Sequence, residues 1–338
     1  MYTIRPFIPN DHDYTAVVAN RNAARPDHLI ILEHLKHSDS VRNPDAQYHR
    51  YVVVWHEGDE ETIVGDAAHS YAYHAKEPGL YGVSWIIHPD HDNDEVNALV
   101  FSHLQTQLAR CQPPLRRIIT SSREDKPVRV AFLEAQGFDV IMRSAMSQLT
   151  VTDFDFAPFA DAEERFAQTG IRIVSVSELM NAGGDFSSDW KQKLYTVANE
   201  IVQDVPSPEE FTEFPKSEFE KFLNHPYFCA DAWFVALDEG GDDKDYVGLS
   251  FVLVNDAQPE KVETGLTGVV RSHRRRNIAT ILKLHVIRFA QDRGIKVIET
   301  DNEENNPMYQ LNLRLGFEPI PASMDFAKEV AAEGAEGS

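Results

Sequence analysis

One order of elements occurs twice in this chain, and it rules out most single-domain folds. An apolar, β-branched segment is followed by a short turn, a helical pattern, a second apolar segment and a helix that ends in Gly-Phe. The first copy runs over residues 82–138 and the second over residues 265–317. Residues 82–91 align with residues 265–274 without a gap. Two copies of one α+β unit explain this repetition better than one large domain does.

The length of the chain agrees with two units. Its 338 residues exceed the size of a typical domain, for which about 150 residues is a common length. We expect a first domain at residues 1–150, an acidic linker at 151–170, a second domain at 171–325 and a disordered tail at 326–338. The tail consists mostly of Ala, Glu and Gly, which cannot form an apolar core.

Composition excludes several classes of function. The hydrophobic content of 42% and the charged content of 25% are ordinary for a globular protein, and no apolar run reaches the roughly 18 residues of a membrane span. A net charge of −22 argues against binding to nucleic acid. The chain has 2 cysteines, which provide neither a disulfide framework nor a metal cluster. We therefore expect a cytoplasmic protein with no nucleic-acid, membrane or metal partner.

The second copy has a basic turn where the first copy has an acidic one. Residues 262–270 predict a strand, and apolar residues at helical spacing over 278–289 predict a helix. The turn between them contains Arg274-Arg275-Arg276-Asn277. Because a helix start presents free N–H groups and the positive end of the dipole, an anion can bind there. The first copy has His91-Asp92-Asn93-Asp94-Glu95, whose carboxylates would repel a phosphate.

The segment from Arg274 to Ala279 resembles the acyl-coenzyme A motif of GNAT N-acetyltransferases, Arg/Gln-x-x-Gly-x-Gly/Ala. Asn277 stands where that family usually has glycine, and asparagine tolerates left-handed backbone angles. Leu315-Gly316-Phe317 matches the end of a second family fingerprint. The resemblance covers residues 171–322. It implies an α+β fold of two tandem GNAT domains, each a mixed, mostly antiparallel sheet flanked by helices with splayed central strands. The first domain would be a degenerate GNAT-like copy.

The same resemblance implies that acetyl-CoA is the cosubstrate and indicates which residues bind it. Two valines of the strand would hold the pantetheine arm, and the turn with the first helical residues would hold the pyrophosphate. The implied coenzyme-binding residues are Val269, Val270, Arg274, Arg275, Arg276, Asn277, Ile278, Ala279, Thr280, Asn305 and Asn312.

Acetyl transfer to an amine needs a base, and the family usually places a carboxylate on this strand. Glu263 is the candidate, with Glu299 and Asp301 in reserve; the alternative for Glu263 is an exposed carboxylate at a strand edge. Many GNAT enzymes use a tyrosine as the acid, but that position is Asn312 here. Tyr309, on roughly the same helical face, could replace it or could serve packing alone.

The predicted function is acetyl-CoA-dependent N-acetylation of a primary amine on a small, cationic molecule, by direct transfer in the second domain. Acidic residues interleaved with phenylalanine suggest the cation, although they could form a solvated loop: Asp204, Glu209, Glu210, Phe211, Glu213 and Phe214. One alternative is a mycothiol-synthase-like enzyme that acetylates a cysteinyl amine, since the tandem layout and residues 305–309 look like that branch. A non-catalytic acyl-CoA-binding module is another. The protein is expected to be a monomer or a homodimer.

Overall fold

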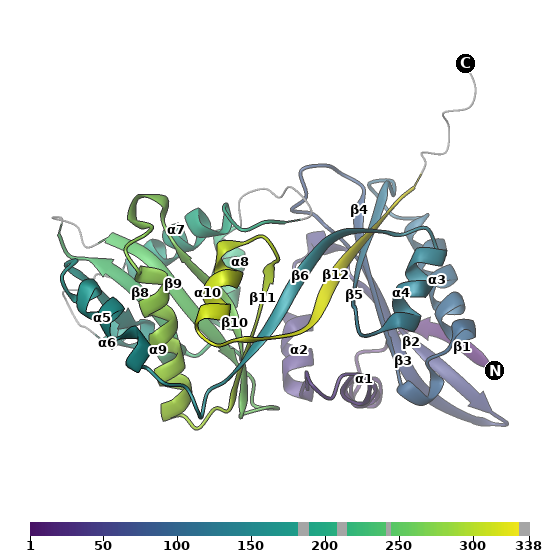
Figure 1. Ribbon diagram of the computed structural model, residues 1–338. Coiled ribbons are helices and arrows are strands. Elements are labelled where there is room, and N and C mark those ends of the chain that lie inside the picture. Colours follow the sequence, from purple (N-terminus) through teal and green to yellow (C-terminus); the bar gives the residue numbers. More distant parts are fainter. Residues whose placement is uncertain (182–188, 208–214, 241–244, 331–338) are drawn as a thin grey trace, which may run out of the picture. The chain divides into compact units, whose positions relative to one another are not determined.

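The computed structural model describes residues 1–181, 189–207, 215–240 and 245–330. The chain forms two compact units, and each includes strands from both halves of the sequence (Figure 1). Unit 1 comprises Met1–Arg143 and the segment that begins at Pro321, whereas unit 2 comprises Ser144–Pro206 and the described residues of Glu213–Ile320. The chain therefore passes into unit 2 within one long strand and returns to unit 1 within another.

Unit 1 is a mixed sheet with helices on both faces. Its strands, in spatial order, are β1 (Tyr2–Pro6), β2 (His49–Glu57), β3 (Glu60–Tyr71), β4 (Leu80–Ile87), β5 (Arg117–Arg123) and β12 (Glu318–Glu329). Its α-helices are α1 (Asp11–Ala24), α2 (Leu32–Ser40), α3 (Asp94–Leu108) and α4 (Pro127–Ala135). All neighbouring pairs are antiparallel except β4 and β5, which run parallel.

Alternating side chains of β2 bury the two faces of this sheet. Val52 and Val54 pack in the cluster that contains residues of α1 and α2, whereas Tyr51 and Val53 pack in the cluster of α3. Because successive strand residues point to opposite faces, the apolar run of β2 supplies both cores. The two helical layers therefore follow directly from this continuous apolar strand.

Unit 2 repeats this architecture with helices and strands of different lengths. Its strands, in spatial order, are β6 (Asp139–Thr150), β11 (Val297–Glu303), β10 (Lys261–Val269), β9 (Asp245–Val254), β8 (Trp233–Asp238) and β7 (Ile171–Ser175). Its α-helices are α5 (Ala160–Ala167), α6 (Val176–Asn181), α7 (Trp190–Val202), α8 (Lys216–Leu223), α9 (Ile278–Asp292) and α10 (Pro307–Arg314). Here β10 and β11 are the parallel pair.

Aromatic contacts show the two faces of the unit 2 sheet. Trp233 stacks on Phe251, with ring centres 3.7 Å apart, and both contact Phe222 of α8. Phe234, the next residue of β8, contacts His285 of α9, 5.5 Å between ring centres. Helix α8 therefore covers one face and α9 the other.

The boundaries between the two units lie at different residues from the predicted domain limits. Residues 144–150 pair with β11 inside unit 2, although we expected them to close the first domain. The expected linker, residues 151–170, contains α5, whose Phe166 is buried in the unit 2 core. Residues 326–329, expected in a disordered tail, form the end of β12 because Phe326 is fully buried and pairs with Thr120.

In each unit the parallel strands pair over a short ladder and then part. The ladder joins Leu80–Gly82 to Arg117–Ile119 in unit 1, and Lys261–Glu263 to Val297–Glu299 in unit 2. Gly82 therefore corresponds to Glu263, and not to Gly265 as the ungapped sequence alignment had it.

A local irregularity of β10 explains why the alignment was misplaced. The register against β9 shifts between Thr264 and Leu266, so β10 contains an extra residue there. That residue is Gly265, and a Cβ atom at this position would overlap the ring of Phe251. Packing of the aromatic cluster on α8 therefore requires glycine at this point of the strand.

Candidate coenzyme and acceptor site

The basic turn of unit 2 presents free backbone N–H groups to one point. Arg275 and Asn277 both adopt left-handed conformations, with φ of 65° and 63°, and Asn277 is the N-cap of α9. The Asn277 side chain makes no capping hydrogen bond, and the first turn of α9 contains no acidic residue. The turn from Arg275 to Asn277, which we call the nest, leads directly into the free N–H groups of the first helical turn, where an anion is favoured. Asparagine thus adopts the conformation for which the family uses glycine.

The arginines before the nest are held by Asp204, which follows α7. Arg271 and Arg274 both donate to the Asp204 carboxylate, and Nε of Arg274 also donates to the Val269 carbonyl at 3.0 Å. Hydrogen bonds from Arg271 and then Arg274 lower the pKa of Asp204 to about 2. Arg275 and Arg276 are exposed. Asp204, which we expected to face an acceptor amine, therefore binds the arginines of the basic turn.

Two buried polar atoms without a partner lie on β10 and α10, beyond the end of the parallel ladder. Among the described residues, parallel pairing stops after Glu263 and Glu299. The hydroxyl oxygen of Thr264 and Oδ1 of Asn312 are buried and have no hydrogen-bond partner in the described structure. Buried polar atoms are normally paired, so unpaired ones at a predicted ligand slot favour a partner that arrives with the ligand. These groups and the nest fit the pantetheine arm and pyrophosphate of acetyl-CoA.

Three carboxylates occupy one face of β10 and β11. Glu263 pairs with Glu299 in the ladder, and Asp301 follows Glu299 by two residues, so all three point to the same side. Lys261 forms an ion pair with Glu299 at 2.7 Å. Asp301 is exposed by its surface area, but the surrounding protein still removes part of the hydration of its carboxyl group. This desolvation raises the pKa of Asp301, and repulsion by the charge of Glu263 raises it further.

Tyr227, which sequence reasoning missed, belongs to the same environment. Burial raises the pKa of Tyr227, and the nearby charge of Glu263 raises it further. The residue lies after α8, and nothing in its local sequence distinguishes it from a packing aromatic. The charge of Glu263 therefore acts on both Tyr227 and Asp301, in each case less than burial does.

The structure places the remaining predicted residues around α10. Asn312 is 1% exposed, and its Nδ2 donates to Oδ1 of Asn302 at 2.6 Å, so it connects α10 to β11. Tyr309 is half-buried on the same helix. Asn305 is exposed, and its side chain donates to Glu303 in its own turn at 2.7 Å.

The other predicted coenzyme residues line the path from β10 to α9. Val269 and Val270 are 8% and 6% exposed, and their side chains belong to the apolar core. Their backbone groups remain the parts that could contact a ligand arm. Ile278, Ala279 and Thr280 form the first turn of α9. The predicted acceptor residues at 209, 210, 211, 213 and 214 lie outside the described residues.

Unit 1 lacks both features of this site. Its helix α3 begins at Asn93, whose side chain accepts a hydrogen bond from the Val96 N–H at 3.1 Å, and the first turn contains Asp94 and Glu95. The helix start is therefore satisfied by its own residues and repels anions. At the third ladder position Gly82 replaces the carboxylate of Glu263.

A comparison with protein families finds one match, which lies almost entirely within unit 2. Residues 196–317 match the family described as the acetyltransferase (GNAT) family, from α7 to the residue before β12. The matched stretch is 122 of the 338 residues of the chain, so the comparison shows that unit 2 is similar to the acetyltransferases of this family. The comparison with curated proteins found no match. In the part of the chain that the structure describes, no helix is both long and apolar enough to cross a bilayer.

Solved structures confirm the predicted fold of tandem GNAT domains. A tandem GNAT protein from the clavulanic acid biosynthesis pathway superposes with a TM-score of 0.72 at 18% identity, over 98% of this chain and 100% of that chain. A GCN5-related N-acetyltransferase from Sphaerobacter thermophilus gives 0.65 at 16% identity, over 98% of this chain and 96% of that chain. At these identities the likeness shows the architecture alone.

Proposed function

We propose that unit 2 transfers the acetyl group of acetyl-CoA to the primary amine of a small, cationic molecule. The observation that supports this most is the open, basic start of α9 beside parted strands, with Glu263 at the point where the strands separate. The nest from Arg275 to Asn277 would bind the pyrophosphate, and the carboxylate face would attract the protonated amine. Arg274, Arg276, Asn305 and Asn312 remain proposed coenzyme contacts on the same grounds.

In the proposed reaction Glu263 accepts a proton from the ammonium group, directly or through one water molecule. The freed nitrogen lone pair forms the C–N bond to the acetyl carbonyl carbon, and the C–S bond to coenzyme A breaks. The second amine proton leaves to solvent or to the carboxylate face, and Tyr309 can donate a proton to the thiolate. Transfer is direct, because the free cysteine of unit 2, Cys229, lies outside the motif and the carboxylate face.

The experiment that tests the proposal is Glu263→Gln, assayed by release of the coenzyme A thiol with a panel of small cationic primary amines. We expect kcat/KM to fall by roughly 10²–10⁴-fold while the affinity for acetyl-CoA is unchanged. Glu260→Gln is the matched control, since the Glu260 side chain is 63% exposed and pairs with Lys296. Turnover that survives Glu263→Gln would show that another group is the base.

The two alternatives give different results in the same assay. A mycothiol-synthase-like enzyme would prefer a cysteinyl amine over the simple cations of the panel. A non-catalytic acyl-CoA-binding module would bind acetyl-CoA with one site per chain but release no thiol with any acceptor. The carboxylate face favours the enzyme, because a binding module has no need of three acidic residues beside the slot.

A further inference from the structure

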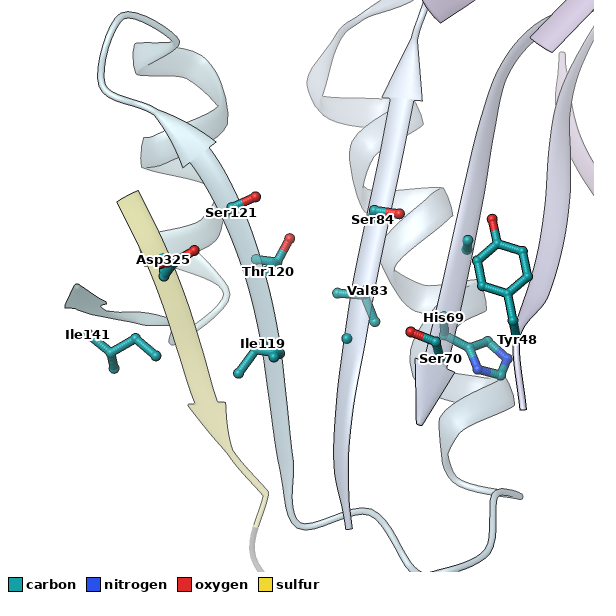
Figure 2. A pocket seen from close by; sticks show the side chains of 12 residues that line it. Tyr48, His69, Ser70, Val83, Ser84, Ile119, Thr120, Ser121, Ile141 and Asp325 are labelled. Carbon is teal, nitrogen blue, oxygen red and sulfur yellow. The ribbon is translucent and has the colours of Figure 1, made fainter. Parts of the chain in front are cut away.

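Unit 1 has a cavity of its own on the sheet face covered by α1. The cavity has a volume of about 300 Å³ and lies over β3, β4, β5 and β12 (Figure 2). This volume is at the lower end of the range for small-molecule sites, roughly 300–1,000 Å³. The cavity belongs to the unit with the acidic helix start, so it is not explained by the coenzyme site proposed for unit 2.

Strand register places the small side chains of the cavity on one face. Ser70 pairs with Gly82, Gly82 pairs with Ile119, and Ser84 and Ser121 follow two residues after these partners. Since paired residues and alternate residues share a face, these positions form a continuous floor. Asp325 pairs with Ser121 and extends the floor onto β12. We call these six residues the hydroxyl floor; its three serines carry hydroxyl groups, and Asp325 adds a carboxylate.

The hydroxyl floor occupies the positions that hold the carboxylates in unit 2. At the third ladder pair, Gly82 and Ile119 replace Glu263 and Glu299. Ser121, two residues further on, likewise replaces the corresponding aspartate of β11. Unit 1 therefore has a cavity at the positions that carry the carboxylate face in unit 2, but it has no carboxylate at the position of Glu263.

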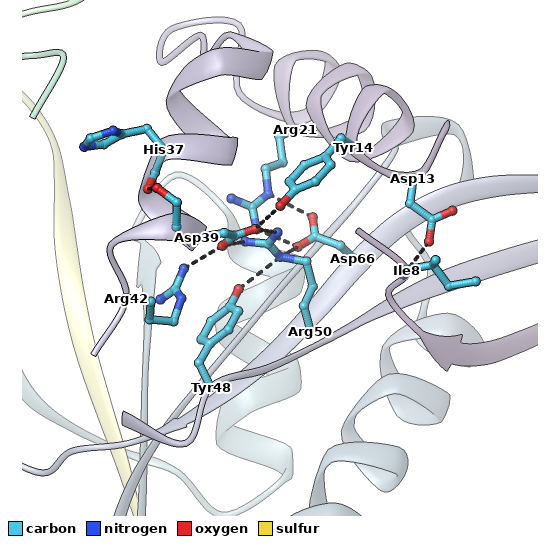
Figure 3. A network of polar contacts seen from close by, with 11 residues as sticks. Ile8, Asp13, Tyr14, Arg21, His37, Asp39, Arg42, Tyr48, Arg50 and Asp66 are labelled. Atoms are coloured by element: carbon cyan, nitrogen blue, oxygen red, sulfur yellow. Dashed lines mark hydrogen bonds and ion pairs between the residues drawn. The ribbon is translucent and has the colours of Figure 1, made fainter. Parts of the chain in front are cut away.

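One wall of the cavity is Tyr48, whose position is fixed by a buried polar network (Figure 3). The Arg42 guanidinium lies 3.5 Å from the centre of the Tyr48 ring, and Nε of Arg50 donates to the phenol oxygen at 3.1 Å. Both arginines bind Asp39, with Arg50 making two hydrogen bonds of 2.6 and 3.1 Å and Arg42 one of 3.0 Å. Burial opposes ionisation of Asp39, but the arginines outweigh it and hold the pKa of Asp39 below its usual value.

The same network is anchored to the sheet. Arg50 is 8% exposed, and its Nε lies 4.0 Å from the Asp66 carboxylate, which in turn binds Arg21 of α1 through two hydrogen bonds of 2.9 and 2.5 Å. These ion pairs and hydrogen bonds lower the conformational freedom of the side chains that they join. The Tyr48 wall is therefore pre-organised before any ligand binds, which reduces the entropic cost of binding.

We propose that this cavity binds a small, uncharged molecule with several hydroxyl groups, such as a monosaccharide, and that unit 1 binds it without acetylating it. Serine and tyrosine hydroxyl groups both donate and accept, as the hydroxyl groups of such a ligand do. No lysine or arginine is among the described residues that line the cavity, so an anion would find no counter-charge. The proposal concerns a different site and does not depend on the activity proposed for unit 2.

The test is saturation-transfer NMR of D-glucose with the full chain, in competition form to give an affinity. Ser84→Leu fills the floor at an exposed position, and Ser102→Leu is the matched control because Ser102 is exposed on α3 and does not line the cavity. We expect glucose to bind the parent and the Ser102→Leu variant, and to bind the Ser84→Leu variant at least about tenfold more weakly. Glucose 6-phosphate should bind more weakly than glucose.

Other results would overturn the proposal. Absence of glucose binding to the parent, equal binding to the Ser84→Leu variant, or preferential binding of glucose 6-phosphate would each exclude a neutral hydroxylated ligand at this floor. If Ser84→Leu lowers the yield of folded protein, Ser121→Leu fills the same floor from an exposed position on β5. An unchanged midpoint of urea unfolding, compared with the parent, verifies that each variant remains folded.

Discussion

Lys283 gives a sharp test of how unit 2 is packed. The residue lies in the middle of α9 and is 4% exposed, with its ammonium nitrogen 5.3 Å from the centre of the Phe317 ring. It forms no ion pair in the described part of the chain. Burial lowers the pKa of Lys283 from 10.5 to about 8, because the charged form has lost its hydration.

The size of the effect follows from these two pKa values. Their difference, 10.5 minus 8, is roughly 2.5, and at about 1.4 kcal/mol for each pKa unit it amounts to about 3 kcal/mol. Below about pH 8 both the folded and the unfolded chain carry the proton, so this free energy opposes folding in full. Between about pH 8 and pH 10.5 the unfolded chain binds more protons than the folded one, and the free energy of unfolding rises with pH.

Lys283→Met removes the charge and keeps most of the side-chain volume. We expect its free energy of unfolding near pH 7 to exceed that of the parent by roughly 2–3 kcal/mol, and the difference to shrink as the pH approaches 10.5. Urea unfolding over this pH range measures both. Lys191→Met, at an exposed position of α7, should change stability by less than about 0.5 kcal/mol. If Lys283→Met is no more stable than the parent at any pH, the ammonium group is not desolvated and the reasoning fails.

Three further predictions concern the basic turn and the carboxylates. Asp204→Asn releases Arg271 and Arg274, so calorimetry should show that acetyl-CoA binds roughly threefold to tenfold more tightly. Weaker binding would mean that Asp204 positions these arginines for the ligand. Asn277→Gly should retain the affinity, whereas Asn277→Val, forced into a left-handed conformation, should cost about 1–2 kcal/mol in urea unfolding and weaken binding; equal behaviour of the two variants would contradict the role of φ. Glu263→Gln should lower the pKa of Asp301 in an NMR carboxyl titration, because it removes a like charge; an unchanged value would separate the two groups.

The sequence could predict the elements that depend on local pattern. Apolar periodicity located both copies of the strand–turn–helix order, and the fold comparison confirmed the tandem GNAT architecture. The turn at Asn277 was predictable for the same reason, since a left-handed residue before a helix needs only a few neighbours. Hydrophobic periods of 2 and 3.6 residues are properties of short segments, so they can be recognised without knowledge of the tertiary structure.

Features that depend on distant contacts were out of reach. The pairing of residues 144–150 with β11 joins segments about half the chain apart, and no local pattern indicates it. Asp204 was expected in the acceptor pocket, but Arg271, 67 residues later in the chain, holds it at the basic turn. The extra residue at Gly265 was hidden because it depends on the Phe251 ring above it. An alignment of the two copies by sequence therefore could not find the true counterpart of Glu263.

The exchange of strands couples the folding of unit 1 to that of unit 2. The sheet of unit 2 includes Ser144–Thr150 from the first half of the chain, and the sheet of unit 1 includes Ser323–Glu329 from its end. A chain cut within residues 151–170 would separate each sheet from one of its strands and leave unpaired edges. Folding of unit 2 therefore constrains β6, and through it the preceding residues of unit 1, whatever chemistry unit 1 performs. Substitutions such as Gly82 and Ser121 at the carboxylate positions are compatible with this constraint, because they change the floor of a cavity and leave the strand pairing intact.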